Sequence, residues 1–346
     1  MGLSGAPLTI QWGTLAAYAR LWEQAAVRNP YQSPGWLRAM ARAYGFPLRF
    51  ALWGDAGVPF VVVPGRFHRG PRRWVSLPFS DRSGVVRRSS GPEHLLPEEF
   101  EALQKALASQ TPRWELRNLL APTSEAPAPT YGNFVVPLDP GQEPRRAMKD
   151  TIRRNVKKAR RAGVEIRRFQ SLEALWIFYR LYGLTHRRHG VPVQPWAWFR
   201  ALWEEVIRRD QGFLTLALYE GRVVAGALFL TDGHTVVYKY GATDYRFQRL
   251  RPNDLLFYEE IQRAWRAGCR AFDLGRVGPG EEGLKTYKRK WGAREIPLYY
   301  TSGNHRMTWE PPAEASPWYH RAARVLRRAP TALLRGIGEN LYAYLA

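Results

Sequence analysis

The residues best suited to chemistry lie near the end of the chain, where an apolar segment meets glycines and cations. Phe272-Asp273-Leu274-Gly275-Arg276 precedes Gly283-Leu284-Lys285-Thr286-Tyr287-Lys288-Arg289-Lys290-Trp291-Gly292. The pattern predicts a buried strand over 271–274, then a glycine-rich loop and a short lysine-bearing segment. Such a loop holds backbone N–H groups and a cation at the open end of a strand, where an anion or a developing oxyanion is stabilised. These residue types fit acyl transfer.

The cations of this segment have separate candidate roles. When an amine attacks an activated ester or thioester, negative charge collects on one oxygen. Lys288 is the candidate to stabilise that charge, and the alternative is a surface lysine paired with an acid. Arg276 and Lys285 are candidates to bind a phosphate or a terminal carboxylate. No general base is evident, because Asp273 lies beside Arg276, where a structural role is expected.

A second concentration of cations, over 144–163, predicts a basic helix. Met148, Ile152, Val156 and Ala159 form one apolar stripe, and Gly163 is placed to end the helix. The other positions carry cations without interleaved acids, so the run is either a solvated outer face or a surface that binds phosphates. The residues that we expect to contact such a polyanion are Arg153, Arg154, Lys157, Lys158 and Arg161.

The elements that must position these residues occur twice in the same order. A helix over 33–44 leads into strands at 50–53 and 59–63, which are separated by glycines. A helix over 196–208 leads into strands at 214–219 and 223–229, which are separated by Glu220-Gly221. We interpret the match as a duplicated α/β module. The proline-rich segment 122–129 predicts a surface connection between the halves.

Further elements follow in the second half. Ser171 is predicted to cap a helix, and the polar cluster at 185–190 with His186 and His189 is expected to hold ordinary surface histidines, without a metal. A strand over 235–243 should place Tyr238 and Tyr240 on the same face. A helix over 255–267 capped by Asn253 or Asp254 should follow. The basic tail is expected to be helical and to pack on the first module, with anionic lipid as its alternative partner.

Composition restricts the class of protein. The 346 residues are 45% hydrophobic and can bury more than one core, so two domains are expected. The net charge of +22 favours nucleic acid, nucleotide-linked sugars or anionic lipid as partners, although compositional bias toward arginine is an alternative cause. A single cysteine, Cys269, allows no internal disulfide and indicates a reducing compartment. Neither a signal peptide nor a membrane span is expected, so we predict a soluble cytoplasmic monomer.

Taken together, several segments resemble the Fem family of peptidoglycan aminoacyltransferases, which are tandem modules of the GNAT acyltransferase fold. The resemblance covers about 32–300 and also extends to Fem-like proteins of exosortase systems and to an acyltransferase domain related to cellulose biosynthesis. The long helical hairpin that many Fem proteins carry is missing. The matching segments are Trp74-Val75-Ser76-Leu77-Pro78-Phe79-Ser80-Asp81-Arg82-Ser83-Gly84, Arg161-Ala162-Gly163-Val164, Thr185-x-x-Arg188-x-Gly190, Tyr238-Lys239-Tyr240-Gly241-Ala242 and Phe272 to Gly292.

The resemblance implies an α/β fold of two tandem GNAT-like modules, each a mixed β-sheet flanked by helices. We expect the modules over 1–140 and 141–310, and the basic helical tail over 311–346. The implied activity is transfer of an amino acid from aminoacyl-tRNA to the stem-peptide amine of a nucleotide-linked or lipid-linked peptidoglycan precursor, without a cofactor or metal. A peripheral location at the inner membrane face fits a lipid-linked acceptor.

The resemblance also implies roles for individual residues. Tyr287-Lys288 falls on the family's FK-type motif, Arg188 matches an arginine that contacts the acceptor, and Tyr238 and Tyr240 would line the same groove. If the donor is aminoacyl-tRNA, the helix from Arg145 to Arg161 would hold its phosphates.

Two other functions stay open. An acyl-CoA-dependent N-acyltransferase would bind pyrophosphate on a glycine-rich loop before a helix. The equivalent segment, 248–254, lacks the glycines, and Pro252 has no N–H to offer. A noncatalytic protein that binds nucleic acid or a membrane through its basic surface is the third possibility; an exposed Lys288 on a convex face would favour it.

Overall fold

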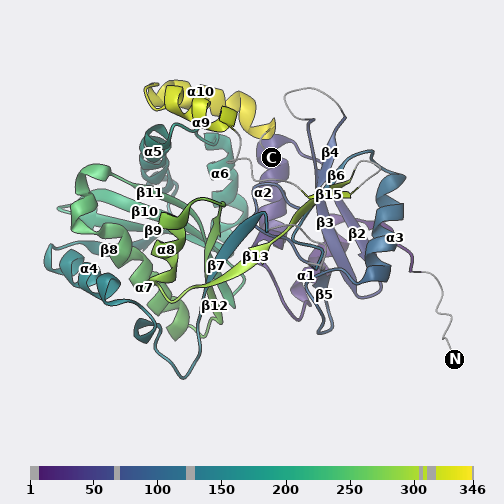
Figure 1. Cartoon of the computed structure of the whole chain (residues 1–346), viewed down its shortest axis with the longest axis horizontal. Helices are drawn as coiled ribbons and strands as arrows, with labels where there is room; N and C mark the ends of the chain where they lie inside the picture. The colour runs from purple at the N-terminus through teal and green to yellow at the C-terminus, as the bar shows by residue number, and fades with distance from the viewer. Residues whose placement is uncertain (1–7, 66–70, 122–128, 304–306, 310–316, 345–346) are drawn as a thin grey trace.

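Two mixed β-sheets flanked by helices make up the protein, as its computed structural model shows (Figure 1). The structure describes residues 8–65, 71–121, 129–303, 307–309 and 317–344. Most of the predicted proline-rich connection, 122–128, therefore lies outside the described residues. The predicted α/β class with two sheet-based modules is confirmed.

The first sheet is built mainly from the beginning of the chain. Its neighbours are antiparallel except for the parallel pair β4 and β6. The strand order is β1 (Gln11–Gly13), β2 (Leu48–Trp53), β3 (Ala56–Val63), β4 (Arg73–Val75), β6 (Trp114–Arg117), β14 (Tyr300–Gly303) and β15 (Met307–Trp309), with β5 (Val86–Arg87) beside β3. The helices of this half are α1 (Leu15–Glu23), α2 (Pro34–Tyr44) and α3 (Pro97–Ala108). A short helix, η1 (Pro30–Gln32), precedes α2.

The second sheet has one parallel pair, β11 with β12. Its strand order is β13 (Arg294–Leu298), β7 (Tyr131–Pro137), β12 (Ala271–Val277), β11 (Thr235–Thr243), β10 (Arg222–Thr231), β9 (Gly212–Tyr219) and β8 (Glu165–Phe169). Each sheet thus takes strands from both sides of residue 140. The helices of the second half are α4 (Asp150–Arg161), α5 (Leu172–His189), α6 (Trp196–Glu205), α7 (Pro252–Arg266) and α8 (Glu282–Arg289). Its short helices are η3 (Pro144–Arg146), η4 (Ile207–Arg209) and η5 (Tyr245–Leu250).

The predicted repeat of elements is present. The helix α2 leads into β2 and β3, and α6 leads into β9 and β10. The Ser33 hydroxyl caps α2 by accepting from the Trp36 N–H (3.2 Å), and Gly45 ends that helix in the left-handed region. Between β9 and β10, Glu220 and Gly221 both have positive φ, as a tight hairpin turn requires.

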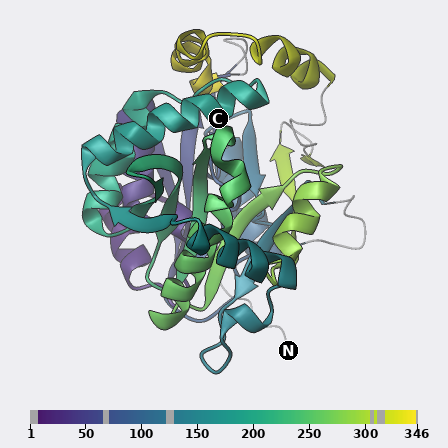
Figure 2. The same ribbon diagram turned by 90° about the vertical axis from the view of Figure 1, so that its left-hand side faces the viewer.

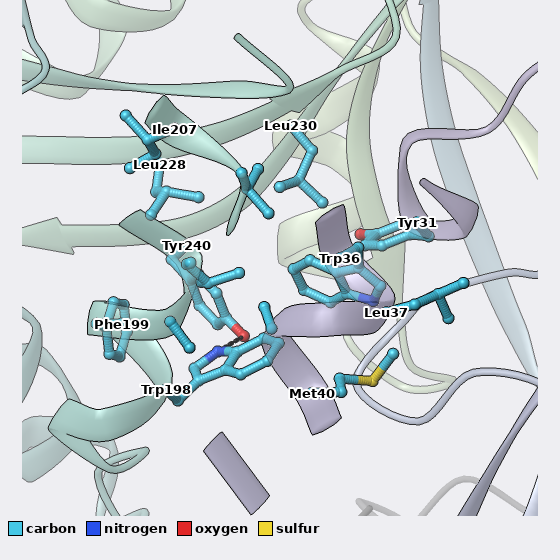
Figure 3. Packing of buried hydrophobic residues seen from close by; sticks show 14 of the residues in the cluster. Tyr31, Trp36, Leu37, Met40, Trp198, Phe199, Ile207, Leu228, Leu230 and Tyr240 are labelled. Atoms are coloured by element: carbon cyan, nitrogen blue, oxygen red, sulfur yellow. Dashed lines mark hydrogen bonds between the residues drawn. The ribbon is translucent and has the colours of Figure 1, made fainter. Parts of the chain in front are cut away.

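The largest hydrophobic core lies between the two sheets and draws on both halves. Trp36 of α2 and Trp198 of α6 meet edge to face with ring centroids 5.0 Å apart (Figure 3). The Trp198 indole N–H donates to the Tyr240 hydroxyl (2.9 Å), so even the polar atom of this tryptophan is satisfied. Because the two repeated helices bury their aromatic faces against each other, neither half has this core to itself.

The prediction that Tyr238 and Tyr240 share a face is wrong. Tyr238 pairs with Phe229 and Tyr240 pairs with Leu228, so Lys239 is an extra residue in β11 and forms a β-bulge. Tyr238 packs against Phe257 of α7 (4.8 Å), whereas Tyr240 packs in the core between the sheets. A bulge shifts the alternation by one residue, which the sequence pattern alone cannot show.

Two predicted boundaries also differ. The helix α7 begins at Pro252 and is preceded by Arg251 in the left-handed region (φ 60°), because the fixed φ of proline suits a first helical position. The strand β12 continues past Leu274 to Val277, through Gly275 at φ 80°. Gly275 is thus part of an irregular strand, where we predicted the beginning of a loop.

The C-terminal tail forms α9 (Pro317–Leu326), α10 (Thr331–Leu341) and η7 (Tyr342–Tyr344). We expected it on the first module; α10 packs on α5 beside the second sheet (Figure 2), and the tail touches the first half through Tyr342, whose ring lies 5.9 Å from that of Phe79. Leu334 is fully buried there, and its carbonyl accepts from the Val193 N–H (3.2 Å). None of the helices in the described part of the chain is long and apolar enough to cross a bilayer.

Candidate active site between the two halves

The neighbouring strands β11 and β12 separate part of the way along the second sheet. They pair only from Thr235 to Val237 and from Ala271 to Asp273, although both strands continue. Irregularities at Lys239 and near Gly275 follow directly after the last paired residues. Bulges bend a strand and redirect its side chains. The chain therefore opens the sheet where Lys239 and Arg276 lie.

A carboxylate from the first half, with only 13% of its side chain exposed, reaches this opening. Asp81 belongs to the segment 76–84, where Leu77 and Phe79 adopt positive φ values that non-glycine residues rarely have. The Tyr31 hydroxyl donates to Asp81 Oδ2 (2.9 Å), and Arg276 Nε lies 3.5 Å from Asp81 Oδ1. Asp81 thereby joins η1 of the first half to β12 of the second sheet.

Lys288, the predicted oxyanion-stabilising residue, lies beside the same opening. It belongs to α8 and is only 7% exposed. Its ammonium group donates to the carbonyls of Gly275 (2.8 Å) and Arg276 (3.1 Å). Burial lowers the pKa of Lys288 to about 8, although Asp81 and Asp273 favour its charged form. Lys288 is therefore a desolvated ammonium group whose pKa is lowered toward neutral pH.

A second lysine, Lys239, was missed as a candidate. Its ammonium group donates to the carbonyl of Phe79 (2.5 Å) and lies 5.1 Å from the centroid of the Tyr31 ring. Burial lowers the pKa of Lys239 to about 8, with Asp81 acting in the opposite direction. Burial by itself would raise the pKa of Asp81, but the cations of Lys239 and Arg276 outweigh it and lower that pKa. We call Tyr31, Asp81, Lys239, Arg276 and Lys288 the junction cluster.

The glycine-rich loop does not provide the free amides that we expected. The Gly275 N–H donates to Asp273 Oδ1 (2.7 Å), and the Gly278 N–H donates to Glu281 Oε2 (3.1 Å). Asp273 also accepts from the Asn133 amide (2.9 Å), and burial raises its pKa. These two amides are already bonded to the chain's own carboxylates, so they are not available to an anion, whereas the cations Lys239, Arg276 and Lys288 lie nearby.

A cavity of about 860 Å³ extends along the unpaired half of β11. Its walls come from the end of α5, from β10 and β11, and from the beginning of α7. Arg188 lines it with its guanidinium group stacked on the Tyr245 ring (3.8 Å), and Tyr238 lines the same cavity. Further cations in its walls are Arg187, Arg246 and Arg327.

The structure thus divides the predicted substrate-binding residues among four places. Arg188 and Tyr238 lie in the cavity, whereas Arg276 lies in the junction cluster with Lys288. Tyr240 is in the core between the sheets, bonded to Trp198. Lys285 pairs with Glu282 on α8 (2.8 Å). Lys239 and Asp81 were detectable, because both lie in segments that carry the Fem resemblance.

The basic helix forms as predicted, and its charges are separate from the junction cluster. Met148, Ile152, Val156 and Ala159 are all buried. The helix α4 packs on α7, where the Asn155 amide donates to Asp254 (2.8 Å). Arg153 pairs with Asp150, whereas Arg154, Lys157, Lys158 and Arg161 are exposed. The described residues contain no group of three or more His, Cys, Asp or Glu side chains that could hold a metal.

Comparison with known families identifies the fold of the second half. The family described as "Acetyltransferase (GNAT) domain" matches residues 146–289, which include α4 and most of α8. This match and the two sheets confirm the predicted tandem GNAT-type architecture. The chain therefore has an acyltransferase fold. No curated protein matches its sequence significantly.

Several solved structures share the fold at low sequence identity. One described as FemX is 14% identical, with a TM-score of 0.61, and the match covers 83% of this chain and 95% of that chain. A C-terminal domain from Agrobacterium fabrum, assigned to a lysylphosphatidylglycerol synthetase, is 12% identical, with a TM-score of 0.58 and coverage of 90% and 96%. L-PGS from Bacillus licheniformis is 12% identical, with a TM-score of 0.53 and coverage of 95% and 100%. These similarities concern the fold alone.

Proposed function

We propose that the protein transfers an amino acid from aminoacyl-tRNA to an amine of a nucleotide-linked or lipid-linked peptidoglycan precursor. The observation that carries this proposal is Lys288, a buried ammonium group beside the opening between β11 and β12. A cation held in a water-poor site stabilises developing negative charge more strongly than one in bulk water. The similarity to FemX supports the proposal at the level of the fold.

The reaction needs one attack and one proton movement. The amine nitrogen attacks the ester carbonyl, a C–N bond forms, and the C–O bond to the tRNA ribose breaks. The amine loses a proton, and the departing ribose oxygen gains one. Lys288 stabilises the tetrahedral oxyanion, Arg276 binds a nearby anionic group, and the substrates relay the proton. Arg188 and Tyr238 bind the acceptor in the cavity.

The choice of tRNA as donor rests on two features. The exposed cations of α4 form a face that suits a phosphate backbone. At the beginning of α7, where an acyl-CoA enzyme would bind pyrophosphate, Asp254 occupies the first turn. Its carboxylate accepts from Tyr287 (2.9 Å) and Asn155, and burial raises its pKa. An acid there, with Pro252 lacking an N–H, disfavours a bound pyrophosphate.

The second candidate is an acyl-CoA-dependent N-acyltransferase. The description of the matching family favours it, because residues 146–289 match an acetyltransferase domain. The arginines of the cavity would also suit the phosphates of CoA. A purely noncatalytic binding role has less support, because Lys288 is buried instead of lying on an exposed convex face.

One experiment distinguishes these functions. Purified protein receives a soluble precursor amine with either charged tRNA or acetyl-CoA, and consumption of each donor is measured. We expect charged tRNA alone to be consumed. Consumption of acetyl-CoA alone would support the second candidate and overturn the first, and consumption of neither would overturn both.

A matched pair of variants tests the role of Lys288. Lys288→Ala should lower kcat by about 10²–10³, the usual effect of removing one oxyanion-stabilising group. Lys105→Ala, which removes an exposed lysine on α3, should leave turnover unchanged. Unchanged turnover in Lys288→Ala would remove that residue from the mechanism.

A further inference from the structure

Three neighbouring helices carry an unusual share of exposed apolar side chains. Among the described residues, α5, α9 and α10 hold six of the twelve large apolar side chains that are exposed. Val325 is 72% exposed and Leu333 is 54% exposed, so neither serves the protein's own core. The six are Trp176, Ile177, Leu184, Val325, Leu333 and Leu341.

Exposed arginines lie among these apolar residues. Among the described side chains of the three helices and their connections, the exposed acids are Glu173 and Glu339. The exposed arginines outnumber these acids. The exposed arginines are Arg180, Arg187, Arg188, Arg321, Arg324, Arg327 and Arg328. Apolar residues that include a tryptophan, mixed with arginines, are the composition of helices that lie in the interface of an anionic bilayer.

The helices form one continuous surface. The Arg335 guanidinium group of α10 lies 5.8 Å from the Trp176 ring of α5. At the end of α5, a Cβ added to Gly190 would lie 1.9 Å from the Ala323 carbonyl of α9, so the backbones approach closely there. Both views show α9 and α10 together at the edge of the molecule above α5 (Figures 1 and 2).

We propose that this surface, formed by α5, α9 and α10, binds an anionic lipid bilayer. The basic helix α4 provides the contrast, because its exposed side is formed by cations while its apolar residues are buried. A nucleic acid needs cations and polar groups, whereas a bilayer interface accepts apolar side chains as well. The exposed Val325 and Leu333 therefore favour lipid over nucleic acid at this surface.

The bilayer surface adjoins the cavity. Leu184, Arg187, Arg188 and Arg327 belong to both. A bilayer bound to α5, α9 and α10 would place the cavity mouth at the lipid headgroups, where a lipid-linked acceptor could enter without leaving the membrane. This choice of acceptor rests on the proposed function, whereas the bilayer binding does not.

Vesicle co-sedimentation of the full chain tests the surface. The two vesicle preparations are phosphatidylcholine alone and phosphatidylcholine with about 30% phosphatidylglycerol, a typical anionic fraction. We expect binding to the anionic vesicles and little to the neutral ones. The double variant Val325→Asp, Leu333→Asp should bind anionic vesicles at least about tenfold more weakly, since it removes two apolar contacts and adds two negative charges.

The matched control is the double variant Val27→Asp, Ile296→Asp, because Val27 (53%) and Ile296 (46%) are also exposed but lie outside α5, α9 and α10. It should bind vesicles like the unaltered protein, and circular dichroism should show that both variants are folded. Unchanged vesicle binding in the double variant, or an equal loss in the control, would overturn the proposal. Loss of tRNA affinity in the double variant with vesicle affinity unchanged would identify a nucleic-acid surface instead.

The failure of this inference is distinguishable from failure of the proposed function. The double variant should turn over a soluble acceptor at the unaltered rate, because neither residue lies in the cavity or the junction cluster. If the protein binds anionic vesicles but consumes no donor, the bilayer-binding proposal stands and the proposed aminoacyl transfer is wrong.

Discussion

Lys288 must carry its proton to stabilise an oxyanion, and its environment makes that proton easy to lose. With a pKa of about 8, Lys288 is charged below that pH and neutral above it. We therefore expect kcat/KM to fall about tenfold per pH unit above pH 8. Lys288→Arg keeps the charge and should move this decline to higher pH. The measurement is a pH profile with spontaneous hydrolysis of the aminoacyl ester subtracted.

Lys239 provides the control for this profile, because its pKa is also lowered to about 8. Lys239→Arg should leave the alkaline decline in place if Lys288 causes it. A profile that Lys239→Arg shifts, and that Lys288→Arg does not, would assign the titration to Lys239.

At the level of single residues, Asp81 is a carboxylate of the first half that pairs with Arg276 of the second half. Its replacement in Asp81→Asn leaves the charges of Lys239 and Arg276 without their shared carboxylate. Because the Asp81 and Arg276 side chains are 13% and 30% exposed, we expect a loss of about 1–3 kcal/mol in the free energy of unfolding at neutral pH, less than for a fully buried ion pair. Because the folded-state pKa of Asp81 is lowered, its contribution is complete above the usual aspartate pKa and disappears as the pH falls through the folded-state value.

Urea unfolding at neutral and acidic pH measures this difference. The exposed Asp150, which pairs with Arg153 on α4, supplies the control. Asp150→Asn should cause no measurable change, since exposed ion pairs contribute little. Equal effects of the two substitutions would show that Asp81 does not hold the junction cluster together.

At the level of elements, α4 has exposed cations on one side and packs on α7 with the other. Its buried stripe packs on α7, so charge reversal on the exposed side should not unfold it. The double variant Lys157→Glu, Arg161→Glu should weaken tRNA binding and reduce the slope of log affinity against log salt concentration by about 2. Filter binding over a range of salt concentrations measures both effects.

The control for α4 reverses two exposed cations on the first sheet's helices, Arg20 on α1 and Lys105 on α3. Arg20→Glu with Lys105→Glu changes the net charge by the same amount. An equal loss of tRNA affinity in this control would indicate a general charge effect and would eliminate a specific site on α4.

For the molecule as a whole, the shared core predicts that the two halves unfold together. Trp198→Ala removes a fully buried indole that touches Trp36 and bonds Tyr240, and should lower the free energy of unfolding by about 4 kcal/mol. Hydrogen exchange should show loss of protection in β3 as well as in β9. Protection that falls in β9 while β3 keeps its original value would mean that each half is stable by itself.

Local patterns account for what could be predicted of the architecture. Each of these patterns depends on residues that are close together in the sequence. Examples are the apolar stripe of α4, the Ser171 cap of α5 and the glycine turns of both hairpins. Their forces act between near neighbours in the sequence, so the pattern of residues is enough to place the elements. The candidate Lys288 came from the same kind of reading, and its role in catalysis stays a prediction.

The sequence by itself determined the α/β elements, their repeated order and the basic face of α4. Only the tertiary structure decided which residues meet at the junction cluster. The bulge at Lys239, which sends Tyr238 and Tyr240 to opposite sides, depends on pairing with β10. The approach of Asp81 to Arg276 depends on how the two halves pack around Trp36 and Trp198. Such contacts join distant parts of the chain, and their energies arise only once both sheets are in place.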